Sequence, residues 1–166
     1  MSSCRGVVAL EGRVFVQARI DHIGIAVSDL SQSLRFFRDA LGLELDPPED
    51  VPSQRVRAHF LQAGEAAVEL VEPTADDSPI AKYMAKRGPG IHHVALRVDD
   101  IIAALAELKA KGVRLIDETP RPGAHDSLVA FIHPSSTHGV LVELKQLRSS
   151  PATSTDSPQS TQRAQR

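Results

Sequence analysis

The chain has 166 residues, of which 42% are hydrophobic and 24% are charged, and its formal net charge at pH 7 is −2. This length and composition predict one globular domain with a core of ordinary size. The small net charge gives no reason to expect nucleic acid or an anionic membrane as a partner, and no apolar run approaches the roughly 20 residues needed to span a bilayer. The single cysteine, Cys4, cannot form an internal disulfide, which favours the cytoplasm as the location.

The first half of the predicted domain begins with a strand and a helix. Apolar residues show no clear periodicity over residues 1–18, which are interpreted as an N-terminal arm. Residues 20–27, with the sequence IDHIGIAV, alternate as a strand does. His22 shares one face with the small residues Gly24 and Ala26, and Ile23, Ile25 and Val27 share the other. Ser28 or Asp29 can cap the helix that follows, and Gly42 can end it.

Three more strands and a linker helix come next. The strands are predicted over residues 43–45, 55–61 and 66–71, with a turn at Gly64 between the last two. The first module, about residues 19–73, is therefore a β-α-β-β-β unit. A helix over about residues 78–87 has Ser78 as its cap and Pro79 at its first position, where proline is favoured, and it connects the two halves.

The second module, about residues 90–147, repeats the first. Residues 91–98, with the sequence IHHVALRV, form its first strand, and Asp99 or Asp100 caps a helix that Gly112 closes. Three further strands are predicted over residues 113–116, 127–131 and 140–144. The sequence therefore predicts an α+β fold in which two tandem βαβββ modules, forming a single domain over residues 19–147, build a curved mixed sheet around a cleft.

The end of the chain differs from the rest in composition. Residues 148–166 are dominated by Ser, Thr, Pro, Gln and Arg, and apolar residues almost vanish. Such a segment cannot bury enough apolar surface to offset the entropy lost on ordering. We therefore predict a disordered C-terminal tail.

Two histidines and two glutamates occupy equivalent places in the two modules. His22 and His93 lie 71 residues apart in the equivalent first strands, and Glu69 and Glu143 lie 74 apart, each within a Val-Glu-Leu tripeptide of the last strand. Alternation turns both carboxylates away from their apolar neighbours and toward the face of the histidines. A lone strand histidine is more often a hydrogen-bonded core residue, and a lone strand glutamate is usually solvated, but the duplicated set predicts a ring of four ligands. Imidazole and carboxylate together suit a divalent first-row metal, which makes the cleft a metal-containing one.

The remaining histidines carry weaker signals. Strict alternation places His92 on the face opposite His93, which favours a structural or ligand-supporting role. His59 lies in the middle of a predicted strand near the cleft and could be structural or functional. Three others fall in or beside predicted loops: His125, His133 and His138.

The assembled segments resemble the vicinal-oxygen-chelate superfamily, which includes glyoxalase I, extradiol dioxygenases and antibiotic-resistance proteins. Within it the chain is most similar to the methylmalonyl-CoA epimerase family. The segments that carry the resemblance are residues 20–27, 68–73, 77–81, 90–95, 131–134 and 139–144, which together span about residues 19–146. The resemblance implies a divalent metal held by His22, Glu69, His93 and Glu143, with cobalt favoured and manganese, nickel or zinc tolerated by the same ligands.

The same resemblance implies a racemase/epimerase that interconverts the (R) and (S) C2 epimers of methylmalonyl-CoA, an acyl-CoA substrate, and a homodimer. Glu143 matches a position that serves both the metal and proton transfer. Some relatives carry a second glutamate on the third strand of the first module, where the approximate match here is Arg57, so His59 or a metal-bound water are the candidates for the second acid/base. Lys82, Lys86 and Arg87 could contact the CoA phosphates, or could be solvated surface residues.

Two other functions remain open on the same fold. One is a glyoxalase-like isomerase or lyase that uses the same metal ring. The other is a resistance-type protein that binds a small molecule without chemistry, although a pure binder needs no open metal site. An iron dioxygenase is expected to use two histidines and one carboxylate, so the extra Glu69 weighs against that class.

Overall fold

The computed structural model describes residues 17–148. The predicted N-terminal arm and C-terminal tail therefore lie, apart from their innermost residues, outside the described residues. Within residues 17–148, no helix is both long enough and apolar enough to cross a membrane.

The first module begins with β1 (Ala18–Ala26), which runs into α1 (Leu30–Leu34). Asp29 caps this helix because its carboxylate accepts the backbone N–H of Gln32. The helix continues as a π-helical stretch, Arg35–Ala40, that the sequence did not predict. The strands that follow are β2 (Glu44–Leu45), β3 (Glu49–Val51), β4 (Val56–Ala63) and β5 (Ala66–Pro73).

The linker helix and the second module follow. Helix α2 (Pro79–Arg87) is capped by Ser78, whose side chain accepts the backbone N–H of Ala81, as the sequence predicted. The second module contains β6 (Gly90–Val98), α3 (Ile101–Ala110), β7 (Arg121–Gly123), β8 (Ser127–Ile132), a 3-10 turn (Pro134–Ser136) and β9 (Val142–Leu147).

The strand predicted over residues 113–116 is wrong. There the chain makes only an isolated bridge between Leu115 and Ile132, and β7 is the strand that pairs with β8 at that edge of the sheet. The strand predicted over residues 140–144 begins instead at Val142. The first difference concerns the edge of the sheet, where pairing depends on neighbours rather than on the local apolar pattern, and the second concerns only where β9 begins.

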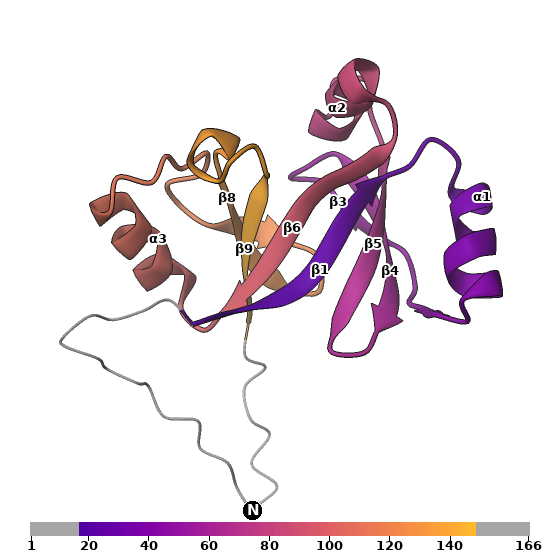
Figure 1. Cartoon of the computed structure of the whole chain (residues 1–166), viewed down its shortest axis with the longest axis horizontal. Coiled ribbons are helices and arrows are strands. Elements are labelled where there is room, and N and C mark those ends of the chain that lie inside the picture. Colours follow the sequence, from indigo (N-terminus) through magenta and orange to yellow (C-terminus); the bar gives the residue numbers. More distant parts are fainter. Residues whose placement is uncertain (1–16, 149–166) are drawn as a thin grey trace, which may run out of the picture.

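The described residues form one mixed sheet of nine strands, in the order β2-β4-β5-β1-β6-β9-β8-β7, with β3 paired to β4. Within each module the first strand lies parallel to the last, β1 beside β5 and β6 beside β9, and antiparallel pairing of β1 with β6 joins the two modules. Helices α1 and α3 lie at opposite sides of the curled sheet in Figure 1. The predicted fold class, two tandem βαβββ modules in a curved mixed sheet, is confirmed.

Three apolar clusters hold this arrangement together. Val27, Leu61 and Leu70 pack with α1, and a second cluster that includes Ile101 and Leu144 packs α3 against β8 and β9. The third lies on the inner, concave side of the sheet and is centred on four buried residues: Val56, Phe60, Val71 and Ile80. The outer clusters therefore fix the helices, while the inner cluster forms the floor of the cleft.

The two ends of the sheet approach each other across the cleft. The Ser53 hydroxyl donates to the carbonyl of Pro122 over 3.0 Å, and Glu49 accepts the backbone N–H of His125 over 2.9 Å. The ring of His125 also packs on Phe60, with centroids 4.2 Å apart. These contacts link the edge of the first module to the edge of the second and hold the sheet in its curved shape.

Two irregularities interrupt the pairing of β1 with β6. The register shifts between Ile20 and His22 and again between Gly24 and Ile25, which leaves Asp21 and His92 without a cross-strand partner. A bulge re-aims the side chain at the extra residue, and bulges are over-represented next to functional sites.

Candidate metal centre

Four adjacent strands of the sheet each contribute one side chain to a single place on its concave face. Glu69 comes from β5, His22 from β1, His93 from β6 and Glu143 from β9. All four are buried, with 2–7% of each residue exposed. Their convergence follows from the duplication, because the central pairing of β1 with β6 brings the equivalent strands of the two modules side by side.

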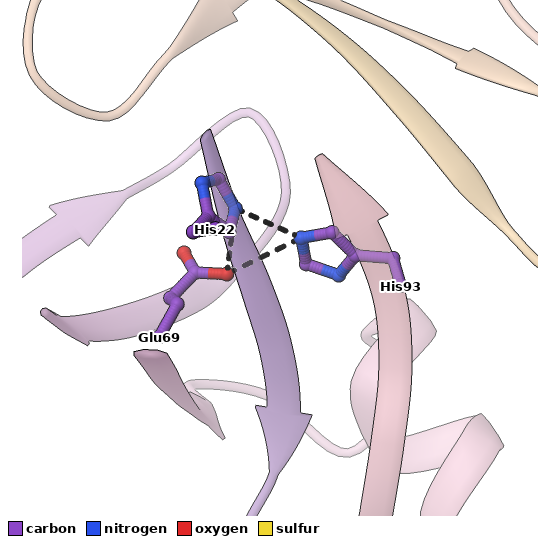
Figure 2. Close-up of side chains that lie close together, drawn as sticks. All are labelled: His22, Glu69 and His93. Carbon is purple, nitrogen blue, oxygen red and sulfur yellow. Dashed lines mark hydrogen bonds and ion pairs between the residues drawn. The ribbon is translucent and has the colours of Figure 1, made fainter. Parts of the chain in front are cut away.

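The ligand atoms face one another at short distances. His22 Nε2 and His93 Nε2 lie 3.1 Å apart, and Glu69 Oε2 lies 3.4 Å from the first and 3.3 Å from the second. Figure 2 shows these three side chains pointing toward one another from their strands. Glu143 Oε2 lies 3.9 Å from His93 Nε2 and stands slightly further from the group.

These distances fit a metal ion. Two ligand atoms about 2.1 Å from an ion, at tetrahedral or octahedral angles, are about 3.0–3.4 Å apart. The separations among His22, His93 and Glu69 fall in that range, and these three residues form a group whose ligand atoms all lie within 4.8 Å of one another. The donor set of imidazole nitrogens and carboxylate oxygens suits a divalent first-row metal.

Glycine at position 24 makes this geometry possible. Gly24 pairs with His93 across the β1–β6 ladder, and an added Cβ at Gly24 would lie 2.1 Å from Cε1 of the His93 ring. The imidazole therefore rests directly over the glycine backbone. No other residue type leaves that space, because every other side chain begins with the Cβ that collides.

Charge within the cluster is arranged around the two histidines. Burial works against ionisation of Glu69, but its hydrogen bonds with His22 and His93 outweigh burial and hold the pKa of Glu69 well below its usual range. Burial disfavours a charged His22, yet hydrogen bonds to Asp21 and Glu69 raise the pKa of His22 to about 9. Burial raises the pKa of Glu143. The metal-free site is thus an ion pair of a histidinium and a carboxylate beside a second carboxyl that holds its proton more readily.

Metal binding is expected to release about one proton per ion at pH 7. A metal needs the neutral Nε2 of His22, and the metal-free ring keeps its proton up to about pH 9. The affinity for cobalt should therefore rise by about tenfold per pH unit between pH 7 and pH 9. Calorimetric titration in two buffers of different ionisation enthalpy counts the released protons. An apparent enthalpy that is the same in both buffers would contradict this prediction.

The cluster lies in a cavity of about 160 Å³ whose walls are mostly apolar. Its apolar lining includes Val51, Val56, Phe60, Val71, Ile80, Ala124, Val129, Phe131 and Leu141. Beyond the four cluster residues, the lining also includes Gln54, His92, Arg121 and Lys145. The apolar surroundings give each charge in the cavity a stronger effect than it has in water. The arrangement can hold an anionic ligand beside an ion.

Comparisons with known proteins show which proteins this chain is similar to. Residues 21–131 match the family described as the Glyoxalase/Bleomycin resistance protein/Dioxygenase superfamily. The mitochondrial methylmalonyl-CoA epimerase of Bos taurus is 40% identical over 136 residues, which are 81% of this chain and 78% of that protein.

Solved structures of methylmalonyl-CoA epimerases are also similar to this chain. The methylmalonyl-CoA epimerase of Mycobacterium tuberculosis has a TM-score of 0.75 at 40% identity, over 78% of this chain and 88% of that one. A variant of the Streptomyces coelicolor methylmalonyl-CoA epimerase was solved in complex with 2-nitronate-propionyl-CoA. It has a TM-score of 0.75 at 39% identity, and the match covers 79% of this chain and 98% of that one. The chain belongs to the methylmalonyl-CoA epimerase family of this superfamily. The resemblance inferred from the duplicated motifs is confirmed.

Within this epimerase-family chain, His92 does not lie where strict alternation places it. The bulge between Gly24 and Ile25 turns His92 into the cavity wall, where its Nδ1 lies 3.0 Å from Nδ1 of His93. Its ring packs edge-on against Tyr83. The predicted face is therefore wrong, whereas a ligand-supporting role agrees with the contact to His93.

The sequence-based expectation that His59 lies near the cleft is wrong. His59 pairs with Leu70, which packs against α1, whereas Phe60 pairs with Glu69 and faces the cavity. The buried His59 ring is hydrogen-bonded to Glu72 over 2.9 Å on the outer face. Arg57 shares that outer face two residues earlier, so neither residue can exchange a proton with a ligand in the cavity.

Replacing His59 with alanine is expected to leave kcat unchanged. The same change should lower the free energy of unfolding by about 1–3 kcal/mol, because the side chain is buried and hydrogen-bonded. Denaturant unfolding and steady-state kinetics on the variant separate the two effects. A large fall in kcat without loss of stability would restore His59 as a catalytic candidate.

The other predicted residues have structural surroundings of their own. His133 caps the 3-10 turn by accepting the backbone N–H of Ser135. Three cations proposed for CoA phosphates, Lys82, Lys86 and Arg87, are exposed on α2. The first turn of α2 lines the cavity through Pro79 and Ile80. Contact with phosphates stays a prediction.

Four polar residues at or beside the cavity were missed at the level of sequence: Asp21, Gln54, Arg121 and Lys145. Asp21 is buried next to His22 Nδ1, and Lys145 is buried in the cavity wall two residues after Glu143. Alternation alone could have placed Lys145 on the face of Glu143. No local signal could have placed Asp21, because it faces inward only as a result of the bulge in β1.

Proposed function

We propose that this protein is a metal-dependent epimerase that interconverts the (R) and (S) C2 epimers of methylmalonyl-CoA. The observation that carries the proposal is the convergence of His22, Glu69, His93 and Glu143 in one apolar cavity. The relatives named above are epimerases of this substrate, and the Streptomyces enzyme binds 2-nitronate-propionyl-CoA. A nitronate carries its negative charge where an enolate would, so that complex supports proton removal next to a thioester.

The four side chains would hold one divalent ion, and we propose cobalt. When bound, the ion supplies positive charge to the carboxylate and thioester oxygens of the substrate, where charge accumulates on loss of the C2 proton. Glu69 stays ionised within the cluster and offsets the charge of the ion. Manganese, nickel and zinc accept the same ligands, so affinity and activity measured with each metal test the choice of cobalt.

Glu143 is the proton-transfer group in this proposal. Its side chain is buried at the cluster, where its carboxylate can exchange a proton with one face of C2. The wall on the side of the first module is formed mainly by Val51, Val56 and Phe60 and also includes Gln54. Inversion also needs a proton delivered to the opposite face of C2, and because His59 lies on the outer face of the sheet, water is the remaining candidate for that role.

Exchange of the C2 proton tests the function. Metal-loaded protein is incubated with one epimer of methylmalonyl-CoA in heavy water, and deuterium incorporation and formation of the other epimer are followed. The proposal predicts both, with cobalt, manganese, nickel or zinc in the site. No exchange with any of the four metals would remove the epimerase and leave a glyoxalase-like enzyme or a binding protein of the same fold.

We propose further that the protein is a homodimer formed through the outer face of β1 and β6. Ile20, Ile23 and Ile91 lie on these strands with 55%, 36% and 63% of each residue exposed. In Figure 1, α1 and α3 lie to either side of this central pair of strands. Light scattering on the protein should give twice the mass of one chain, and Ile91→Glu should shift it toward the monomer.

The cytoplasmic location stays a prediction, which fractionation of cells that express the protein would test.

A further inference from the structure

Asp21 is a buried carboxylate on which three donors converge, although nothing in the proposed reaction requires it. Only 5% of the residue is exposed. Its Oδ1 lies 2.8 Å from His22 Nδ1 and 2.9 Å from Lys145 Nζ, and its Oδ2 accepts Arg97 Nε over 2.6 Å. Both carboxylate oxygens are therefore occupied. Asp21 cannot serve as a further metal ligand without giving up these contacts.

The contact with His22 joins Asp21 to the metal cluster. His22 faces the cluster with Nε2, and its other nitrogen points away from His93 and Glu69 in Figure 2. An ionised carboxylate only accepts hydrogen bonds, so Nδ1 of His22 must donate to Asp21. This fixes the tautomer in which Nε2 of the neutral ring has a free lone pair for a metal.

Lys145 and Arg97 hold the carboxylate in place. Lys145 is only 2% exposed, and its ammonium also lies 5.3 Å from the centre of the Phe60 ring. A buried ammonium beside a buried carboxylate persists only where each compensates the other. Lys145 shares Oδ1 with His22 and Arg97 holds Oδ2, so the two cations anchor the carboxylate, and this limits rotation of the imidazole.

The two histidines of the cluster differ in this respect. His93 Nδ1 is paired with the imidazole of His92 over 3.0 Å, whereas His22 Nδ1 is paired with a carboxylate. A carboxylate partner makes the imidazole a stronger ligand than an imidazole partner does. His22 should therefore depend more on its partner than His93 does on His92.

We propose that Asp21 is the positioning residue of the metal centre, which selects the Nδ1–H tautomer of His22 and is itself anchored by Lys145 and Arg97. The inference rests on the metal site of the proposed function but not on the reaction. Loss of the carboxylate leaves His22 free to carry its proton on Nε2, facing the cluster. Metal binding must then reverse that tautomer before the ring can coordinate.

Cobalt affinity tests the proposal in matched variants. Asp21→Asn alone leaves Lys145 buried without its counter-charge, so the informative variant is the double change Asp21→Asn with Lys145→Met, which is neutral and similar in shape. We expect calorimetric titration to show a loss of affinity of about 10–100-fold in the double variant. Lys109→Met removes an exposed lysine that pairs with Glu118 far from the cluster, and it should bind cobalt as the unchanged protein does. A folded double variant with unchanged affinity would overturn the proposal.

A second measurement needs no variant at all. In zinc-loaded protein, nitrogen-15 chemical shifts of the imidazoles report which nitrogen of His22 carries the proton and which is coordinated. We expect a protonated Nδ1 and a coordinated Nε2, and a purely structural role for Asp21 would not require either. Protonation of Nε2, coordination through Nδ1, or failure of the unchanged protein to bind either metal would each overturn the proposal. Metal binding with this tautomer but without C2 proton exchange would instead remove the proposed reaction and leave the role of Asp21 in place.

Discussion

Replacing Gly24 with alanine is expected to remove metal binding and epimerase activity together. The new Cβ would lie 2.1 Å from Cε1 and 2.5 Å from Nδ1 of His93, well inside contact distance. His93 must then rotate away from His22 and Glu69, which breaks the group of three closest ligands. We expect a loss of cobalt affinity of at least about 100-fold, because displacing a ligand should cost at least as much as removing an outer partner of one.

The measurement is cobalt titration by calorimetry on the folded variant, with activity assayed in parallel. Gly64→Ala is the matched control, since an added Cβ there meets nothing within 4 Å although the residue has a φ of +73°. That control should lose about 1–2 kcal/mol of stability through backbone strain and keep its cobalt affinity. If Gly24→Ala bound cobalt normally, the close packing of His93 over position 24 would be wrong.

Replacing Glu143 with glutamine is expected to lower kcat by about 10²–10⁴-fold. The amide keeps the size of the side chain and one oxygen that can face the ion, but it cannot take up the C2 proton. Cobalt affinity should fall much less than kcat, because Glu143 lies further from the group than the other three ligands. Steady-state kinetics at saturating cobalt separate the two effects.

Glu118→Gln provides the comparison for this change, because Glu118 is an exposed partner of Lys109 outside the cavity. Its kcat should equal that of the unchanged protein. A Glu143→Gln variant that retained full kcat at saturating cobalt would show that another group moves the proton, and would confine Glu143 to metal binding.

The duplicated pattern predicted the centre of the fold and the four converging side chains. Alternation placed Glu69 and Glu143 on the same face as His22 and His93, and the structure brings all four together. This succeeded for the two glutamates because they lie in regularly paired parts of β5 and β9, where side chains alternate strictly. His22 and His93 each lie beside a bulge but keep a cross-strand partner.

Alternation failed where the ladder is irregular. His92 and Asp21 face inward because each occupies a bulge between β1 and β6, and a bulge depends on the partner strand rather than on the residues within it. The prediction that His59 lies near the cleft was wrong for a different reason. Its strand was placed correctly, but which face meets the cavity depends on the pairing of β4 with β5, which one strand cannot reveal.

The short edge strands also could not be predicted from the sequence. Strands β3 and β7 have three residues each, and β7 contains Pro122, so neither shows an apolar period. They form because they complete the two ends of the sheet, where Ser53 and Pro122 meet across the cleft. Long-range contacts of this kind produce no recognisable pattern in the local sequence.

Anomalous diffraction from crystals of the cobalt-loaded protein tests the metal centre most directly. One peak per chain is predicted, within about 2.0–2.3 Å of the Nε2 atoms of His22 and His93 and of a carboxylate oxygen from Glu69 and from Glu143. A peak at any other place, or no peak at full cobalt loading, would contradict a metal centre built from these four side chains.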